Sequence, residues 1–175
     1  LLEREDIVFK PHLVDRVINF VGILKHYTGR HAGKPFVLLP WQQFAIASIY
    51  GFYKIENGEE NRLVSSVYIE MARKNGKSAL AAALCLYHLI GDGEMNAEVY
   101  LAANSRDQAK VSFTMCRNFV AGLDPKQKYL DSYRDRINFD KTLSFMRVLA
   151  ADSSKLDGPN PSMFLLDEYH AAKNS

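Results

Sequence analysis

The chain has almost no cysteine and no long apolar run. Its two cysteines, Cys85 and Cys116, lie in apolar stretches without a CxxC motif or a Cys/His cluster. This excludes a zinc site and a disulfide framework, so we expect two buried, reduced thiols. The longest apolar run, 79–87, has nine residues, whereas a membrane-spanning helix needs about 20. Residues 1–6 are too charged for a signal peptide. We therefore expect a protein that is neither secreted nor bound to a membrane.

A large excess of charge of either sign is missing as well. The 22 Lys and Arg residues and 20 Asp and Glu residues give a net charge of +2, far below the bias of a dedicated nucleic-acid-binding domain. With 47% hydrophobic and 24% charged residues, the composition is that of a packed globular protein. A length of 175 residues predicts one domain. Because the chain begins without Met and breaks off after 171–175, we expect a fragment of a longer protein.

Hydrophobic periodicity divides this single domain, 1–175, into an N-terminal helical part, 1–62, and a core, 63–175. We predict helices over 11–27, 40–53, 78–90 and 105–121, and strands over 63–70, 98–103, 136–139, 143–149 and 163–166. The strands at 136–139 and 143–149 are predicted to form a hairpin. Because strands alternate with helices, we predict an α/β fold with a mostly parallel sheet flanked by helices.

A phosphate-binding loop is predicted after the strand at 63–70. Gly76-Lys77-Ser78 matches the second half of the P-loop (Walker A) pattern G-x-x-x-x-G-K-[ST], while Met71 stands where the first glycine would be. Gly76 allows the backbone to approach a phosphate, and the N–H groups at the helix start bind an anion. We expect Lys77 to reach the β- and γ-phosphates and the Ser78 hydroxyl to bind Mg²⁺. Taken alone, the tripeptide also fits an ordinary solvated helix start.

Two carboxylates follow the last predicted strand. The apolar residues 163–166 end in Asp167 and Glu168, at the edge of the sheet where α/β proteins bind ligands. In P-loop NTPases the first acid (Walker B) holds Mg²⁺, and an adjacent acid can act as general base toward water. Taken alone, the pair also fits an acidic helix start. Together with the P-loop, it indicates an ATPase. The strands between the two motifs and the Glu directly after the Asp resemble the additional-strand, catalytic-glutamate (ASCE) branch of P-loop ATPases.

Four segments together resemble the ATPase domain of the large terminase subunit of tailed bacteriophages, the family that drives DNA into procapsids. The resemblance covers residues 36–172. The segments are 39–42, similar to the family's adenine motif; 73–78, similar to its P-loop, which commonly lacks the first glycine; 101–109, after the second core strand; and 156–161 with 166–170, around the acidic pair.

The resemblance implies that adenine is bound near the start of the helix at 40–53. A Gln amide offers the donor and acceptor that complement adenine N6 and N7. We select Gln42 for this role, with Gln43 as the alternative, because periodicity does not show which of the two points inward. Trp41 either stacks on the base or serves as a core anchor, the commoner role of a single Trp at a helix start.

The resemblance also assigns roles within the loop. Arg73 is expected to neutralise transition-state charge, on its own nucleotide or on that of a neighbouring subunit; the alternative is a purely structural ion pair. Lys74 is either solvated or assists at the phosphates, and Asn75 belongs to the nucleotide-binding loop. The implied catalytic residues are Glu168, Arg73 and Lys77, and the implied metal ligands are Ser78 and Asp167.

The resemblance to this family implies ATP and Mg²⁺ as cofactors. It implies double-stranded DNA, a small terminase subunit and the portal protein as partners, a homo-oligomeric ring when assembled, and a monomer in isolation. The expected location is the host-cell cytoplasm, with transient docking on the procapsid. Terminases carry a further strand and a nuclease domain after the acidic pair, and neither lies within these residues, so we expect no nuclease activity from this chain. The alternative functions are a helicase-like nucleic-acid translocase and a nucleotide-binding regulatory module without turnover.

Overall fold

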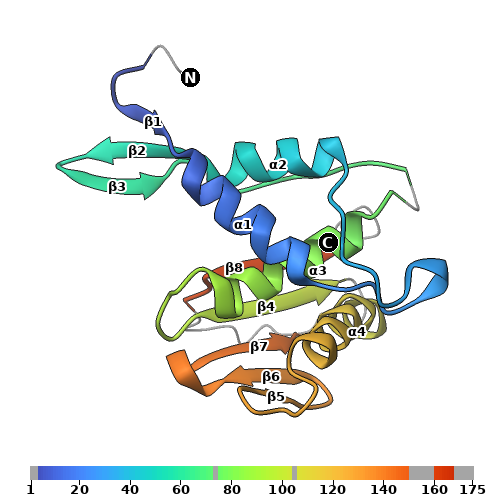
Figure 1. Ribbon diagram of the computed structural model, residues 1–175. Coiled ribbons are helices and arrows are strands. Elements are labelled where there is room, and N and C mark those ends of the chain that lie inside the picture. Colours follow the sequence, from blue (N-terminus) through green and yellow to red (C-terminus); the bar gives the residue numbers. More distant parts are fainter. Residues whose placement is uncertain (1–3, 73–74, 104–105, 150–159, 168–175) are drawn as a thin grey trace, which may run out of the picture.

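The chain builds two β-sheets that are connected by helices (Figure 1). The computed structural model describes residues 4–72, 75–103, 106–149 and 160–167, with the backbone alone for residues 106 and 107. A small antiparallel sheet has the strand order β1-β2-β3, and a five-stranded sheet has the order β5-β6-β7-β4-β8. The elements are β1 (Ile7–Phe9), α1 (Pro11–Ile23), η1 (Gly29–His31), α2 (Pro40–Tyr50), β2 (Phe52–Glu56), β3 (Glu59–Arg62), α3 (Lys77–Leu86), η2 (Tyr87–Gly91), β4 (Glu98–Ala103), α4 (Arg106–Leu123), β5 (Leu130–Ser132), β6 (Arg136–Phe139), η3 (Asp140–Thr142), β7 (Ser144–Val148) and β8 (Met163–Asp167).

The N-terminal part is not wholly helical, which corrects the prediction for residues 1–62. Both predicted helices form with a proline in the first turn, but α1 ends at Ile23 and α2 at Tyr50, before the predicted ends. The three strands β1, β2 and β3 were not predicted. The β2–β3 turn has positive φ at both Asn57 (53°) and Gly58 (81°), as a two-residue type I′ hairpin turn requires.

The five-stranded sheet is mixed, which corrects the prediction of a mostly parallel sheet. Strand β4 pairs in parallel with β7 and β8, whereas β6 pairs antiparallel with β5 and β7. The predicted hairpin is therefore confirmed as β6–β7. Its connection is only the 3₁₀ turn η3, and a parallel pairing would need a much longer crossover. The strands predicted at 98–103 and 163–166 are confirmed as β4 and β8.

The strand predicted over 63–70 is wrong. This segment has no ladder partner among the described residues, and its apolar side chains Val67 and Tyr68 are 51% and 70% exposed. The sheet's outer strand on the β4 side is β8, and it pairs along its length with β4 alone. Residues rich in β-branched and aromatic side chains form a strand only where a neighbouring strand accepts their hydrogen bonds, and this segment has none in the described part of the chain.

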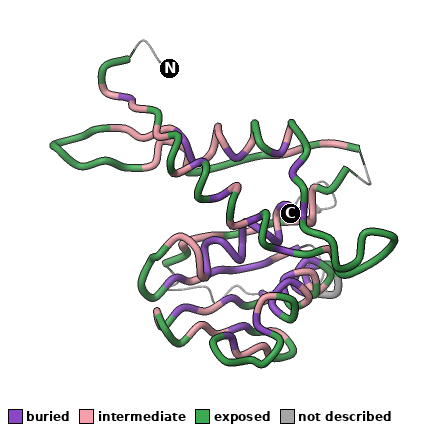
Figure 2. The backbone as a smooth tube through the Cα atoms, viewed as in Figure 1, coloured by how far each residue is buried: buried purple, intermediate pink, exposed green. Residues whose placement is uncertain are grey.

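Helix α3 forms the centre of the core. It follows the predicted phosphate-binding loop and lies between the α1–α2 pair and the five-stranded sheet (Figure 1). Its residues Leu80 and Ala82–Leu86 are all buried, and Figure 2 shows this helix as a largely buried segment. A helix that is apolar on every side must be covered on every side, and α1, α4 and β8 provide that cover. In the described part of the chain, no helix has the length and apolarity that crossing a membrane requires.

A buried polar cluster joins the far ends of α2 and α3. The helix α3 continues into the π-helical turn η2, which places His88 against Tyr50, the last residue of α2. The Tyr50 hydroxyl lies 3.0 Å from His88 Nε2, and His88 Nδ1 lies 3.5 Å from Asp92 Oδ2. Arg62 of β3 lies 3.2 Å from the same Asp92 oxygen and its guanidinium covers the Tyr50 ring. The cluster therefore ties the small sheet to the two helices that reach the phosphate-binding loop.

The burial of His88 makes the stability of this protein depend on pH. Burial lowers the pKa of His88 to about 4, although the charge of Asp92 opposes this effect. The unfolded chain binds a proton at its ordinary pKa of about 6.5, so the unfolding free energy falls as the pH is lowered from about 6.5 to about 4, by about 3 kcal/mol from this group. We expect His88→Gln to remove this contribution in urea titrations at pH 7.5 and pH 4. An equal loss of stability in the wild type and the variant would contradict this prediction.

Candidate nucleotide site

The predicted phosphate-binding loop ends at the start of α3. Gly76 has φ 80° and ψ 13° and is the N-cap of this helix, and its carbonyl accepts the Leu80 N–H at 3.0 Å. The first N–H groups of α3 have no partner within the helix and thus form an anion-binding site. Lys77 and Ser78 occupy the first turn and are half-buried, and the Asn75 side-chain amide donates to the Ala72 carbonyl at 3.0 Å. The described part of the loop thus ends in a left-handed glycine at a helix start, and its binding of a phosphate stays a prediction.

Gln42 connects the predicted adenine motif to this loop. Its side chain is 2% exposed. Its Oε1 accepts the Leu39 N–H at 2.8 Å, and its Nε2 makes a long contact of 3.5 Å with the Gly76 carbonyl oxygen. A Cβ added at Gly76 would lie 3.1 Å from the same Nε2. Both the positive φ and this close approach therefore favour glycine at position 76.

The structure places the two glutamines differently. Gln42 points inward, whereas Gln43 is exposed and its amide donates to the Leu38 carbonyl at 3.2 Å. Trp41 is partly buried and packs against the hydrophobic core, so an anchoring role is evident. The contact of either glutamine, or of Trp41, with adenine stays a prediction.

Asp167 is the last residue of β8, as the sequence predicts for a carboxylate at the edge of the sheet. It lies beside Ala103, the last residue of β4. The hydroxyl of Ser112 on α4 donates a 2.6 Å hydrogen bond to Asp167 Oδ2, and Ser112 is 1% exposed. The bond is partly buried, and a charge-assisted bond of this length holds the carboxylate in one orientation. The sequence gives no sign of this contact, because its two residues lie on separate elements and share no motif.

Among the described residues, the two cysteines and the acidic and histidine side chains offer neither a reactive thiol nor a preformed metal site. Cys85 and Cys116 are free and buried, as predicted. Burial, and secondarily the charge of Asp167, raises the pKa of Cys85 to about 12, so this thiol is no nucleophile near neutral pH. No group of three His, Cys, Asp or Glu side chains in this part of the chain could hold a metal ion.

The donors present nevertheless fit Mg²⁺ bound together with a nucleotide. Mg²⁺ in such sites takes oxygen ligands from one or two protein side chains, substrate phosphates and water. The Ser78 hydroxyl and the Asp167 carboxylate are oxygen donors of this kind, on a helix and a strand that pack together. Arg73, Lys74 and Glu168 lie outside the described residues, and their predicted roles stay predictions.

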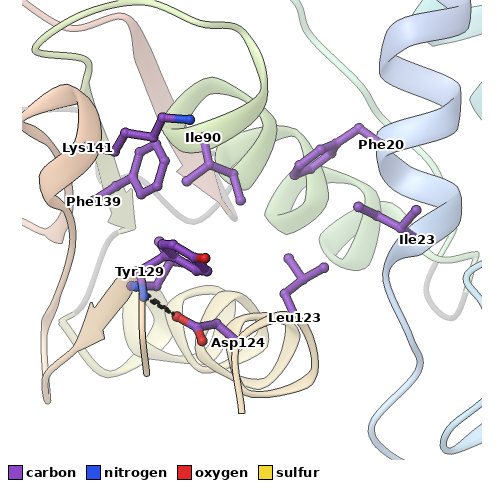
Figure 3. Close-up of a pocket in the computed structure, with 9 residues that line it drawn as sticks. Phe20, Ile23, Ile90, Leu123, Asp124, Tyr129, Phe139 and Lys141 are labelled. Atoms are coloured by element: carbon purple, nitrogen blue, oxygen red, sulfur yellow. Dashed lines mark hydrogen bonds between the residues drawn. The ribbon is translucent and has the colours of Figure 1, made fainter. Parts of the chain in front are cut away.

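A cavity of about 390 Å³ lies elsewhere in the molecule, and Figure 3 shows its lining. Its walls are mostly apolar and include Phe20, Leu123 and Phe139. The carboxylate of Asp124 at its edge accepts three backbone N–H groups, from residues 128, 129 and 130. That carboxylate therefore stabilises the turn between α4 and β5. None of the predicted site residues lines this cavity.

The fold and these groups define an α/β domain with a left-handed glycine at a helix start and a carboxylate at the end of a strand packed against that helix. The family model of the terminase large subunit, ATPase domain, matches residues 40–175. The chain therefore belongs to this family of phage proteins, and the resemblance seen in the sequence is confirmed.

Relatives of known identity agree with this assignment. The chain is 28% identical over 145 residues to the terminase large subunit of Enterobacteria phage HK97. This alignment covers 80% of this chain and 27% of that protein. It is 26% identical over 139 residues to the terminase large subunit of Lactococcus phage p2, covering 76% of this chain and 26% of that protein. The crystal structure of the HK97 bacteriophage large terminase superposes with a TM-score of 0.74 and 25% identity, over 92% of this chain and 32% of that one. The chain thus spans about a quarter of the length of these curated relatives.

Proposed function

We propose that this chain hydrolyses ATP, with Mg²⁺, to power the movement of double-stranded viral DNA into a procapsid. The observation that carries the proposal is the left-handed Gly76 at the start of α3, followed by Lys77 and Ser78, in a chain that belongs to the terminase ATPase family. A glycine in this conformation supports the proposal, because it lets the backbone approach a phosphate at a helix start whose N–H groups favour an anion.

In the proposed reaction, water attacks the γ-phosphorus of ATP and the bond to the β–γ bridging oxygen breaks, giving ADP and phosphate. The Lys77 ammonium group and the first N–H groups of α3 bind the β- and γ-phosphate oxygens. Glu168 accepts the proton of the attacking water. Arg73 neutralises the charge that develops on the transferred group, from the same subunit or from a neighbour.

Ser78 and Asp167 would hold Mg²⁺ in this site. When bound, the ion neutralises charge on the β- and γ-phosphates. The role of the protein is to present the two oxygen donors in a fixed arrangement, and the bond from Ser112 to Asp167 contributes to this by fixing the carboxylate. Adenine is expected next to Gln42 or Gln43 at the start of α2.

The proposed partners are double-stranded DNA, the small terminase subunit and the portal protein, with a homo-oligomeric ring on the procapsid in the host-cell cytoplasm. The experiment is a packaging assay, in which the protein, procapsids and ATP are mixed with duplex DNA and DNA protected from nuclease is measured. We expect protection that requires ATP and is lost with Lys77→Ala. Protection of DNA by the Lys77→Ala protein at the wild-type level would contradict the proposal.

Ser112 provides a test of the metal site that does not depend on turnover. We expect Ser112→Ala to weaken Mg²⁺-dependent nucleotide binding by roughly 10-fold or more, the usual effect of losing a partner that orients a ligating carboxylate. Binding of ATP in EDTA should not change, because Ser112 has no role at the phosphates. The fluorescence of Trp41, the one tryptophan of the chain, offers a readout in both conditions.

The matched control for Ser112 is Thr114→Ala, which removes a hydroxyl of α4 that is bonded only locally, to the Lys110 carbonyl at 2.7 Å. If Ser112→Ala weakened binding equally with and without Mg²⁺, the bond to Asp167 would serve the fold and not the metal site.

A further inference from the structure

The segment between α1 and α2 concentrates positive charge. Residues 25–35, which we call the basic arm, contain Lys25, Arg30 and Lys34, two histidines and no acidic residue. The rest of the chain has 19 basic and 20 acidic side chains, as the totals of 22 and 20 show. The small positive net charge of this protein therefore resides in the arm.

The basic arm is held in one shape by its own backbone. The His26 N–H donates to the Lys34 carbonyl at 2.9 Å, and the Gly33 N–H donates to the His26 carbonyl at 2.7 Å. Lys25 and Pro35 form a β-bridge across its base, and η1 forms its tip. Gly29 (φ 68°) and Gly33 (φ 80°) adopt the left-handed conformation that these turns require.

The base of the arm is anchored by aromatic contacts. The His26 ring stacks on the Phe36 ring with centroids 5.0 Å apart. The rings of Phe36 and Tyr27 meet the Phe119 ring of α4 edge-on, at 6.1 and 6.2 Å. The arm projects from the molecule as the blue loop at the right of Figure 1. Because these contacts already hold the arm in one conformation, little conformational entropy of the loop is lost when a partner binds there.

The three cations of the arm are exposed and form no ion pair with any residue that the structure describes. Lys25, Arg30 and Lys34 are all exposed, and Figure 2 shows the arm as an exposed loop. The ion pairs found among the described residues involve none of the three. In contrast, Lys10 and Lys54 of the small sheet are each paired with a glutamate. Three unneutralised cations on one rigid loop attract a polyanion.

We propose that the basic arm binds the phosphate backbone of double-stranded DNA. The choice of DNA rests on the proposed function, because a motor that moves along any sequence needs contacts to phosphates and not to base edges. An Arg guanidinium can bind a phosphate through two hydrogen bonds, and a Lys ammonium binds it as a point charge. With a net charge of only +2 on the chain, the arm gives weak, salt-sensitive binding per subunit, and a ring of subunits would multiply it.

The test compares the wild type with the variant Lys25→Gln/Arg30→Gln/Lys34→Gln, using a fluorescently labelled DNA duplex without nucleotide. Each lost phosphate contact lowers the slope of log K against log salt by about 0.9. For three contacts, the wild-type affinity should fall about 40-fold more than that of the variant between 50 and 200 mM salt. ATP hydrolysis by the variant without DNA should equal that of the wild type.

Two further variants make the result decisive. Lys126→Gln/Arg134→Gln/Lys141→Gln removes the same charge from exposed positions outside the arm, and it should keep most of the salt dependence. Lys25→Arg/Lys34→Arg keeps the charge of the arm and should bind as the wild type does. An equal loss in the two glutamine variants, an unchanged slope in the arm variant, or no duplex binding by the wild type would each overturn the inference. Hydrolysis measured in parallel separates these outcomes from failure of the proposed function, which would appear as no phosphate release by the wild type.

Discussion

Replacement of Lys77 by Ala is expected to lower ATP hydrolysis by roughly 10²–10³-fold or more, the worth of one positioned donor at developing charge. Lys77 is the first residue of α3 and follows the left-handed Gly76. Its ammonium group is therefore the positive charge that we expect to bind the β- and γ-phosphates. The measurement is single-turnover hydrolysis, together with ATP affinity from equilibrium titration.

The control for Lys77 is Lys126→Ala, which removes an exposed cation outside the loop. Lys77→Ala should melt at nearly the wild-type temperature, because a half-buried lysine at a helix start contributes little to the core. Wild-type hydrolysis by Lys77→Ala would exclude the loop as the phosphate site.

Replacement of Glu168 by Gln is expected to slow hydrolysis by roughly 10²–10⁴-fold, the usual worth of a positioned general base. The amide keeps the shape and hydrogen-bonding capacity of the side chain but cannot accept the proton of the attacking water. Binding of ATP with Mg²⁺ should therefore stay close to that of the wild type. Nucleotide affinity and single-turnover rate, measured across a Mg²⁺ titration, separate the two effects.

Asp167→Asn is the companion variant, because loss of a metal ligand weakens metal binding, whereas loss of a general base slows hydrolysis. It should raise the Mg²⁺ concentration needed for half-maximal binding and weaken the affinity for the metal–nucleotide complex. If Glu168→Gln hydrolysed ATP at the wild-type rate, the acidic pair would be a helix start and the proposed catalytic centre would be lost.

The parts of the fold that local sequence determines were predicted well. The starts of α1 and α2 at a proline, the strand β4 and the hairpin β6–β7 agree with the structure. The prediction of a strand at 63–70 was wrong. Strand formation depends on a pairing partner elsewhere in the chain, and local composition does not reveal whether that partner exists. The hairpin β2–β3 did carry a signal, the dipeptide Asn57-Gly58, which is typical of a two-residue turn.

The sequence predicted the motifs that make up the candidate site, but it did not predict the contacts between their residues. The spacing around Gly76 and the apolar run before Asp167 identify the loop and the acidic strand. That Gln42 points toward Gly76 depends on where the tertiary structure places the start of α2 relative to the start of α3, which periodicity alone does not resolve. The bond from Ser112 to Asp167 joins α4 to β8, and only the tertiary structure brings these two residues together.

The loop before α3 and the carboxylates of Asp167, the last residue of β8, and Glu168 are proposed to form one Mg²⁺-dependent ATPase site. The most direct test is the release of phosphate from ATP by the wild-type chain, with Mg²⁺ and after addition of excess EDTA. We expect release that requires Mg²⁺ and disappears with EDTA. Release that continues unchanged in EDTA, or no release by a folded wild-type chain that binds ATP with Mg²⁺, would contradict it.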